Sequence, residues 1–151
     1  LIIDNIQDPH NFGACIRTAN AAGVSLIIKR KTNSVGLTPT VHKVASGGCR
    51  NIIIHESNNV IQLIKTLKKY NIPIIGTADS GEENIYSKRT YPNGFTLVVG
   101  SEDEGIRKSV MNYCDLVVRI PIYGSVDCLN LSVATGVALY QLREHLKNPS
   151  D

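Results

Sequence analysis

Short apolar runs alternate along the chain with longer stretches of helical periodicity. Runs with the length of strands lie at residues 1–3, 26–28, 52–54, 74–75, 95–99 and 116–118. Stretches with helical character lie at residues 11–22, 40–45, 59–70, 105–113 and 131–146. Continuously apolar strands separated by helices are typical of a parallel sheet that is buried on both faces. The pattern therefore predicts an α/β fold with a mostly parallel sheet and helices on both of its faces.

The segments outside the strands differ in polarity, and each difference predicts a location. The helix at 59–70 is amphipathic, with Val60 and Ile64 on its apolar side and lysines on the other. The helix at 131–146 is apolar or small nearly all round as far as Gln141, which predicts burial inside the domain or against a second copy. Residues 79–94 are polar and rich in turn formers, so we expect a surface excursion there.

Composition narrows the class of protein. The chain has 151 residues, of which 42% are hydrophobic and 19% are charged, as expected for one globular domain spanning residues 1–151. No run of eighteen apolar residues is present, so no membrane span is predicted. The chain opens on a strand-like Leu1-Ile2-Ile3-Asp4 without a starting Met, and we therefore expect an upstream part.

Cysteine spacing and net charge bear on compartment and partners. The four cysteines lie far apart without a C-x-x-C pair, which argues against zinc and against a disulfide framework. A reducing cytoplasm is the simplest location. The histidines show no ligand spacing either, so no metal is expected. A net charge of +3 permits RNA binding without requiring it.

The first segment with candidate chemistry runs from Asp8 to Ala19. Pro9 and Asn11 fit a helix start, with Asn11 as a cap for free backbone amides. Arg17 is the only charged residue between Phe12 and Leu26. The planar guanidinium presents several N–H donors, which suit phosphate or ribose oxygens. For this residue alone, an arginine that faces solvent is the simpler interpretation.

The second segment, residues 99–107, follows a predicted strand and opens a predicted helix. Its glycines are spaced as G-x-E-x-x-G, and Glu102, Asp103 and Glu104 fill the loop. Carboxylates repel a pyrophosphate, so a dinucleotide site is disfavoured and a ligand that lacks phosphates or carries positive charge fits better. Asp103 and Glu104 are also compatible with a solvated helix start, which leaves Glu102 as the functional candidate. Arg107, Lys108 and Arg119 could meet a polyanion, or could simply be solvated.

The third segment, residues 120–134, is a polar loop that contains glycine and joins a buried strand to the last helix. Packing alone does not explain such a loop, and loops in this position hold the ligands of many α/β proteins. Asn130 and Ser132 could each serve as a cap for the helix.

The order of the three segments is more specific than any one of them. D-P-x-N-x-G-x-x-x-R, G-x-E-x-x-G and I-P-x-x-G-S-V-x-x-L-N-x-S-V-A resemble the three motifs of the SpoU branch of RNA 2′-O-methyltransferases, over residues 1–143. The resemblance implies a C-terminal trefoil knot, a rare exception to the absence of knots in proteins. It also implies S-adenosyl-L-methionine as cofactor, bound by backbone groups that fall on Gly100, Ile120 and Leu129. A homodimer with the last helix and the knot in its interface is implied as well.

The implied chemistry is an in-line transfer of an activated methyl group to a ribose 2′-hydroxyl. The family resemblance places Arg17 at that hydroxyl. Because guanidinium keeps its proton, we interpret Arg17 as a positioner that stabilises the developing alkoxide, with a phosphate or solvent taking the proton. Asn11, Glu102 and Asn130 match the remaining functional positions and would orient Arg17, the ribose and the loop. Cys128 stands where the family often has serine, so any role of that hydroxyl is in doubt here.

The resemblance favours a guanosine of large-subunit ribosomal RNA as the substrate. A tRNA guanosine is the second interpretation, and an RNA-binding relative without catalysis is the third. The joint presence of Asn11, Arg17, Glu102 and Asn130 argues against the third. Ribosomal members of the family carry a small N-terminal RNA-binding domain, which we expect upstream of Leu1.

Overall fold

A computed structural model describes residues 1–91 and 94–146. Its strands form one seven-stranded sheet in the order β3-β2-β1-β6-β4-β7-β5, and every pairing between them is parallel. In chain order the elements are β1 (Ile2–Ile3), α1 (Pro9–Ala21), β2 (Leu26–Arg30), α2 (Pro39–Ala45), β3 (Ile53–Ser57), α3 (Val60–Lys69), β4 (Ile74–Thr77), β5 (Glu83–Asn84), β6 (Thr96–Val99), α4 (Lys108–Met111), β7 (Leu116–Arg119) and α5 (Leu131–Arg143). The predicted α/β architecture is confirmed.

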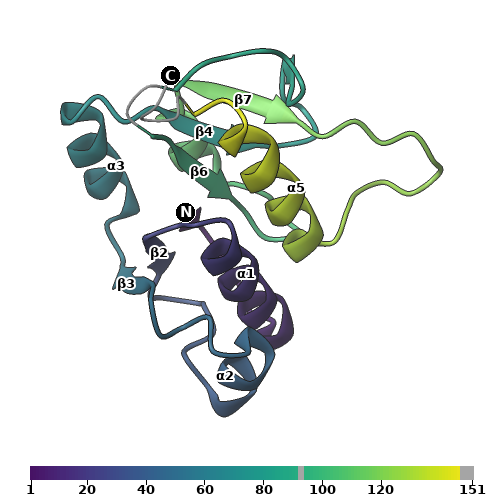
Figure 1. Cartoon of the computed structure of the whole chain (residues 1–151). Helices are drawn as coiled ribbons and strands as arrows, with labels where there is room; N and C mark the ends of the chain where they lie inside the picture. Colours follow the sequence, from purple (N-terminus) through teal and green to yellow (C-terminus); the bar gives the residue numbers. More distant parts are fainter. Residues whose placement is uncertain (92–93, 147–151) are drawn as a thin grey trace.

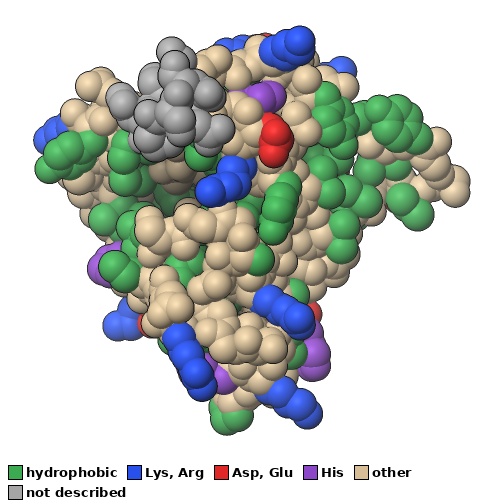
Figure 2. All heavy atoms as spheres, viewed as in Figure 1, with side chains coloured by type: hydrophobic (Ala, Val, Ile, Leu, Met, Phe, Trp, Pro, Cys, Tyr) green, Lys and Arg blue, Asp and Glu red, His purple; other side chains and the backbone are tan. Residues whose placement is uncertain are grey.

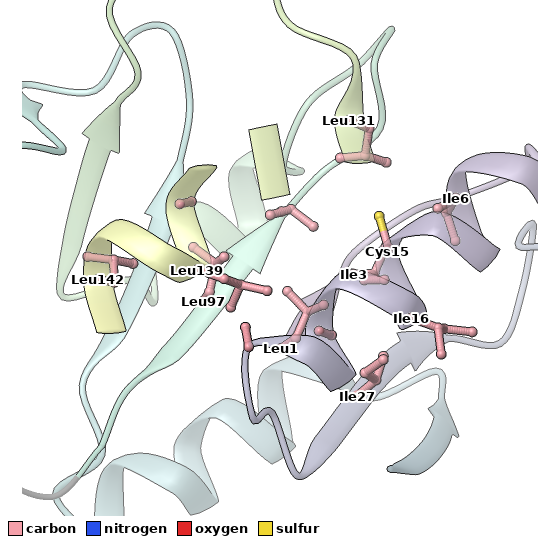
Figure 3. Packing of buried hydrophobic residues seen from close by; sticks show 14 of the residues in the cluster. Leu1, Ile3, Ile6, Cys15, Ile16, Ile27, Leu97, Leu131, Leu139 and Leu142 are labelled. Carbon is pink, nitrogen blue, oxygen red and sulfur yellow. The ribbon is translucent and has the colours of Figure 1, made fainter. Parts of the chain in front are cut away.

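Helices cover both faces of the sheet (Figure 1), and the apolar strands account for this arrangement. Successive residues of a strand point to opposite faces. Ile3 therefore belongs to the cluster that contains residues of α1, α2 and α5, whereas Ile2 belongs to the cluster that contains residues of α3 and α4. Figure 3 shows the first cluster, in which Leu97 of β6 lies close to Leu139 of α5. A strand with two buried faces needs apolar residues at every position, as the sequence pattern has here.

Small residues allow α1 to lie close to its neighbours. A Cβ on Gly13 would lie 2.7 Å from the Cβ of Val44, so α2 packs against bare backbone. At the other end of α1, Gly23 has a φ of +76°, which ends the helix. Arg143 of α5 then donates a hydrogen bond of 2.8 Å to the carbonyl of Ala22. These contacts fix α1 between α2 and α5, with its N-terminus at the carboxyl edge of the sheet.

Two sequence predictions were wrong in detail. The helix expected at 105–113 is only Lys108–Met111; Gly105 has a left-handed φ of +63° and Arg107 is the N-cap, so the helix begins three residues later than expected. The expected surface excursion at 79–94 contains β5, which pairs with β7, and also Ile85 and Tyr91, which are 1% and 7% exposed. Isolated apolar anchors in a polar stretch have no periodicity to reveal them. Residues 92–93 of that stretch lie outside the described residues.

The structure gives the bounds of the last helix but does not test the predicted knot. α5 ends at Arg143, three residues before the predicted end, and residues 147–151 lie outside the described part of the chain. Strand order and pairing do not describe threading, so the knot stays a prediction. Among residues 1–91 and 94–146, no helix is long and apolar enough to cross a membrane.

Candidate functional site

The loops that follow β1, β6 and β7 meet at the carboxyl edge of the sheet. This follows from the parallel pairing, since all strands end at the same edge and β1 lies beside β6. The loop after β1 leads into α1, the loop after β6 comprises residues 100–107, and the loop after β7 leads into α5. Ligands of open α/β sheets bind at this edge, where connections leave in opposite directions from neighbouring strands.

Asp4, at the end of β1, holds both ends of the 100–107 loop. Its backbone N–H donates to the carbonyl of Val99 at 2.9 Å, where the loop begins. Its carboxylate accepts hydrogen bonds from the backbone N–H of Arg107 at 2.9 Å and from Arg107 Nη2 at 2.6 Å, where the loop ends. Asp4 is 0% exposed, and its hydrogen bonds raise the pKa of the Arg107 guanidinium. A buried carboxylate that is paired in this way is costly to disrupt.

Within the loop, the backbone folds back on itself. The N–H of Gly105 donates to the carbonyl of Ser101 at 2.9 Å, and the N–H of Glu104 donates to Ser101 Oγ at 3.1 Å. A Cβ on Gly100 would overlap the carbonyl carbon and oxygen of Gly105. The turn therefore requires glycine at position 100, and it presents Glu102 at its outer side.

Asn11, Glu102 and Asn130 form one hydrogen-bonded group that joins the three loops. Asn130 Nδ2 donates to Asn11 Oδ1 at 2.9 Å and to Glu102 Oε1 at 3.0 Å. Glu102 Oε1 also accepts from the backbone N–H of Leu131 at 3.0 Å. Asn130 Oδ1 in turn accepts from the N–H of Ser132 at 2.9 Å and so caps α5. The Nδ2 donor and the Oδ1 acceptor of the Asn130 side chain are both in hydrogen bonds, which fixes the orientation of the amide.

Two cavities lie beside this group. The larger, a cleft of about 410 Å³, extends along the ends of β4, β6 and β7. The smaller, of about 200 Å³, lies beside the N-terminus of α1. Both cavities are lined by Leu131 and by the turn from Ser101 to Glu104, whereas Asn11 lines only the smaller one and Asn130 lines neither. Within the described residues, Asn11 Nδ2 and Glu102 Oε2 form no further hydrogen bond, so one donor and one acceptor remain for a ligand.

The larger cleft has the volume and lining of a small-molecule site. Its lining includes the apolar side chains of Ile106, Met111, Ile120, Ile122 and Leu129. Four carboxylates, those of Asp79, Glu102, Asp103 and Glu104, also line it. An apolar cleft with a negative rim fits S-adenosylmethionine, which combines an adenosine with a sulfonium cation. Gly100 has no side chain, so it lines the cleft with backbone atoms alone.

The structure brings most of the sequence candidates together. Gly100, Ile120 and Leu129 all line the larger cleft. Cys128 lines it too and is exposed. Arg17 stays apart from the Asn11 group, because six residues of helix separate it from Asn11 by about 9 Å along the axis and turn it to another face. Its side chain is exposed, as the simpler sequence interpretation of Arg17 has it.

Three interpretations of single residues need correction. Asn11 is not the cap of α1: that residue is Asp8, whose carboxylate accepts from the N–H of Asn11 at 3.0 Å. The helix therefore starts earlier and leaves the Asn11 side chain free for Asn130. Arg107 is occupied by Asp4, and Arg119 donates to the carbonyls of Gly81 and Glu82 at 2.8 and 3.0 Å. Neither guanidinium is simply solvated or held ready for a polyanion.

The structural role of Asp4 and Arg107 was missed by sequence reasoning. A charged residue directly after an apolar strand was the available signal at Asp4, but its partner is 103 positions away.

All four cysteines are free, and burial raises the pKa of the Cys15 thiol to about 11, so it packs as a neutral group. Among residues 1–91 and 94–146, no cluster of His, Cys, Asp or Glu could hold a metal ion.

Comparison with known proteins shows the family of this chain. The SpoU rRNA Methylase family matches residues 1–140. A 23S rRNA (guanosine-2′-O-)-methyltransferase RlmB of Neisseria meningitidis serogroup B is 42% identical over 150 residues, which cover 98% of this chain and 60% of the relative. The RlmB of Yersinia pestis is 41% identical, over 94% of this chain and 57% of the relative. The chain belongs to the SpoU rRNA methylase family.

Solved structures show the same fold. An AdoMet-bound rRNA methyltransferase from Sinorhizobium meliloti superimposes with a TM-score of 0.84 at 26% identity, over 97% of this chain and 56% of the other. A TrmH/SpoU tRNA modifying enzyme from A. aeolicus has a TM-score of 0.83 at 29% identity, over 95% of this chain and 73% of the other. The chain thus spans about three fifths of the length of the curated relatives it matches.

Proposed function

We propose that this chain transfers a methyl group from S-adenosylmethionine to the ribose 2′-hydroxyl of a guanosine in large-subunit ribosomal RNA. The observation that carries the proposal is the Asn11–Glu102–Asn130 group beside two cavities, both of which Glu102 lines. One cavity suits the methyl donor and the other suits the acceptor. The names of the RlmB relatives support the choice of a ribosomal guanosine.

The larger cleft is the proposed cofactor site. The backbone at Gly100, Ile120 and Leu129 would hold the cofactor, and the carboxylates of the rim would favour its positive charge. When bound, S-adenosylmethionine supplies a methyl group on a sulfonium, which is already activated for transfer. The protein therefore has to align the acceptor oxygen and assist the loss of its proton.

The smaller cavity is the proposed ribose site. Asn11 Nδ2 can donate to a ribose oxygen there, and Glu102 Oε2 can accept from a ribose hydroxyl. In the reaction the 2′-oxygen gains the methyl carbon while the carbon–sulfur bond breaks. The hydroxyl proton passes to a substrate phosphate or to solvent, and Arg17 stabilises the developing alkoxide without giving up its own proton.

Helix geometry places Arg17 on another face of α1 than Asn11, and we propose that it contacts a ribose held by a second copy. A homodimer is supported by the apolar side chains that α5 and the preceding loop leave exposed. Tyr123 and Val126 of the loop are 89% and 62% exposed, and Val133 and Tyr140 of α5 are about half exposed. Figure 1 shows the loop projecting from the molecule beside α5.

Two parts of the proposal concern context. A tRNA guanosine is the second candidate substrate, supported by the likeness to the tRNA modifying enzyme from A. aeolicus. We place the reaction in the cytoplasm, in keeping with four free thiols. The single catalytic domain over residues 1–151 and an RNA-binding domain upstream stay predictions.

Labelled methyl transfer tests the activity. Incubated with S-adenosylmethionine and unmodified bacterial RNA, the chain is expected to form 2′-O-methylguanosine, detected by nucleoside mass spectrometry in the ribosomal fraction. Arg17→Ala is expected to lose transfer and to keep cofactor affinity by calorimetry. Label in tRNA alone would select the second candidate, and the absence of methylated guanosine from every RNA would refute the proposal.

Mixing two inactive variants tests the homodimer. If Arg17 serves the site of the other copy, a mixture of Arg17→Ala with Glu102→Ala forms some dimers with one intact site. Methyl transfer is therefore expected to reappear on mixing and to reach about a quarter of the unmutated rate, because half of the dimers are mixed and each has one site. No recovery between two variants that form mixed dimers, or a monomer by light scattering, would contradict this arrangement.

A further inference from the structure

The positive charge of the chain is concentrated in one continuous segment. Residues 9–55 contain six Lys or Arg residues and no Asp or Glu, whereas the rest of the chain has ten Lys or Arg and all thirteen acids. The segment therefore carries a formal charge of +6 and the remainder −3. The net charge of +3 hides this asymmetry, which indicates where a polyanion would approach.

Three exposed side chains of this segment, His42, Lys43 and Arg50, form what we call the α2 basic surface. They lie on α2 and on the turn that follows it. Val41 and Ala45 on the opposite side of α2 are 0% exposed, so the charges occupy the face that α2 turns to solvent. In Figure 2, Lys, Arg and His side chains gather at the lower end of the molecule, where Figure 1 places α2.

The charges of this surface are not neutralised by the protein. Lys29 of the same segment is buried and paired with Glu56 at 2.9 Å, so its charge is not available at the surface. Lys43 and Arg50 form no ion pair with any residue of 1–91 or 94–146. Their charges are therefore available to an anion from outside.

The α2 basic surface borders Arg17. Gly48, in the turn between Lys43 and Arg50, packs against α1 so closely that a Cβ would lie 3.1 Å from the Cα of Arg17. Asn20 of α1 fixes this turn by donating from Nδ2 to the carbonyl of Gly48 at 3.0 Å. An RNA strand whose ribose meets Arg17 would therefore bring its neighbouring phosphates to the α2 basic surface, whichever copy holds the nucleotide.

We infer that the α2 basic surface binds the phosphate backbone of the substrate RNA next to the methylated nucleotide. The inference rests on the proposed function for its choice of polyanion. Contacts to phosphates set the position of the strand and carry no sequence information. The surface would thus supply affinity and register, while the smaller cavity would hold the reacting nucleotide.

Charge removal with a matched control tests the inference. In the double variant Lys43→Gln, Arg50→Gln, the Kd for a fluorescein-labelled RNA hairpin is expected to rise about tenfold at low salt. The slope of log affinity against log salt concentration should become shallower by about 0.7 for each single-strand phosphate that the variant no longer neutralises. Fluorescence anisotropy measures both quantities without a methyl donor.

The double variant Lys69→Gln, Lys88→Gln removes the same charge from exposed positions on α3 and in the β5–β6 connection. Its RNA affinity is expected to change less than twofold, and both doubles should bind S-adenosylmethionine as the unmutated chain does. Equal weakening by the two doubles would show an effect of net charge only and would overturn the inference. Competition by polyglutamate as effective as that by RNA would overturn it as well.

Failure of the inference and failure of the proposed function give different results. If no RNA is methylated but the α2 double alone loses RNA affinity and salt dependence, the surface binds RNA and the methyl-transfer proposal fails. If methylation occurs and the α2 double binds RNA with unchanged affinity and slope, the inference fails. In an active protein, the KM for RNA should rise in the α2 double while kcat at saturating RNA stays unchanged.

Discussion

Gly100→Ala is expected to abolish useful binding of S-adenosylmethionine. The new Cβ would overlap the carbonyl group of Gly105, which is backbone and cannot swing aside as a side chain can. The turn must open, which displaces the floor of the larger cleft and the Glu102 that follows it. We expect the Kd for the cofactor to rise more than tenfold, and the free energy of unfolding to fall by about 3 kcal/mol. Calorimetry and urea denaturation measure the two effects.

Gly36→Ala is the matched control for this variant. A Cβ on Gly36 meets no atom within 4 Å, and the residue lies outside both cavities. It should leave both cofactor affinity and stability close to those of the unmutated chain. Cofactor binding that survives Gly100→Ala at full strength would show that the turn does not form the cofactor site.

Glu102→Ala is expected to lower kcat for methyl transfer by about 100-fold while the protein stays folded. The substitution removes the acceptor shared by Asn130 Nδ2 and the N–H of Leu131. Asn130 can then rotate away from Asn11, and the ribose loses its alignment. A displacement of about 1 Å in a reacting group costs a factor of this size. Single-turnover kinetics with saturating RNA and cofactor measure the chemical step directly.

Glu104→Ala provides the comparison within the same loop. Glu104 is exposed and contributes only its backbone N–H to the turn, through Ser101 Oγ. Its removal changes the charge equally but leaves the Asn11–Glu102–Asn130 group intact, so kcat should change less than threefold. If the two variants lose the same activity, the charge of the loop matters and the position of Glu102 does not.

The sheet and its helices were predictable from the sequence because strands that are buried on both faces are apolar at successive positions. Each predicted strand matches an observed strand to within a few residues. Elements that are held by a few long-range contacts have no such apolar run in the sequence. Within the described residues, β5 has two residues and pairs with β7 alone, and Ile85 beside it is an isolated buried apolar side chain. α4 begins late because the left-handed Gly105 precedes it, which a count of apolar positions does not detect.

In the candidate site, too, some residues were identified from local sequence and others became apparent only from the fold. Residue types identified Glu102 and Asn130, and parallel topology explains why their loops meet. The interpretation of Asn11 as a cap was wrong, because Asp8, three positions earlier, caps α1. Both residue types are good N-caps, so residue type alone does not show at which of them the helix begins. The part of Asp4 was not foreseen, since an ion pair with Arg107 depends on the fold and not on local sequence.

The pairing of β1 with β6 has a consequence for how the chain acquires its shape during synthesis. β1 lies in the middle of the sheet, yet its partner on one side, β6, begins at Thr96. β1, β2 and β3 can associate early, but one edge of β1 then stays open while roughly a hundred residues are translated. Unpaired strand edges invite pairing with other chains. The buried Asp4 likewise lacks Arg107 throughout that interval, so the edge that carries the proposed site is completed only after the nascent chain has extended past both elements.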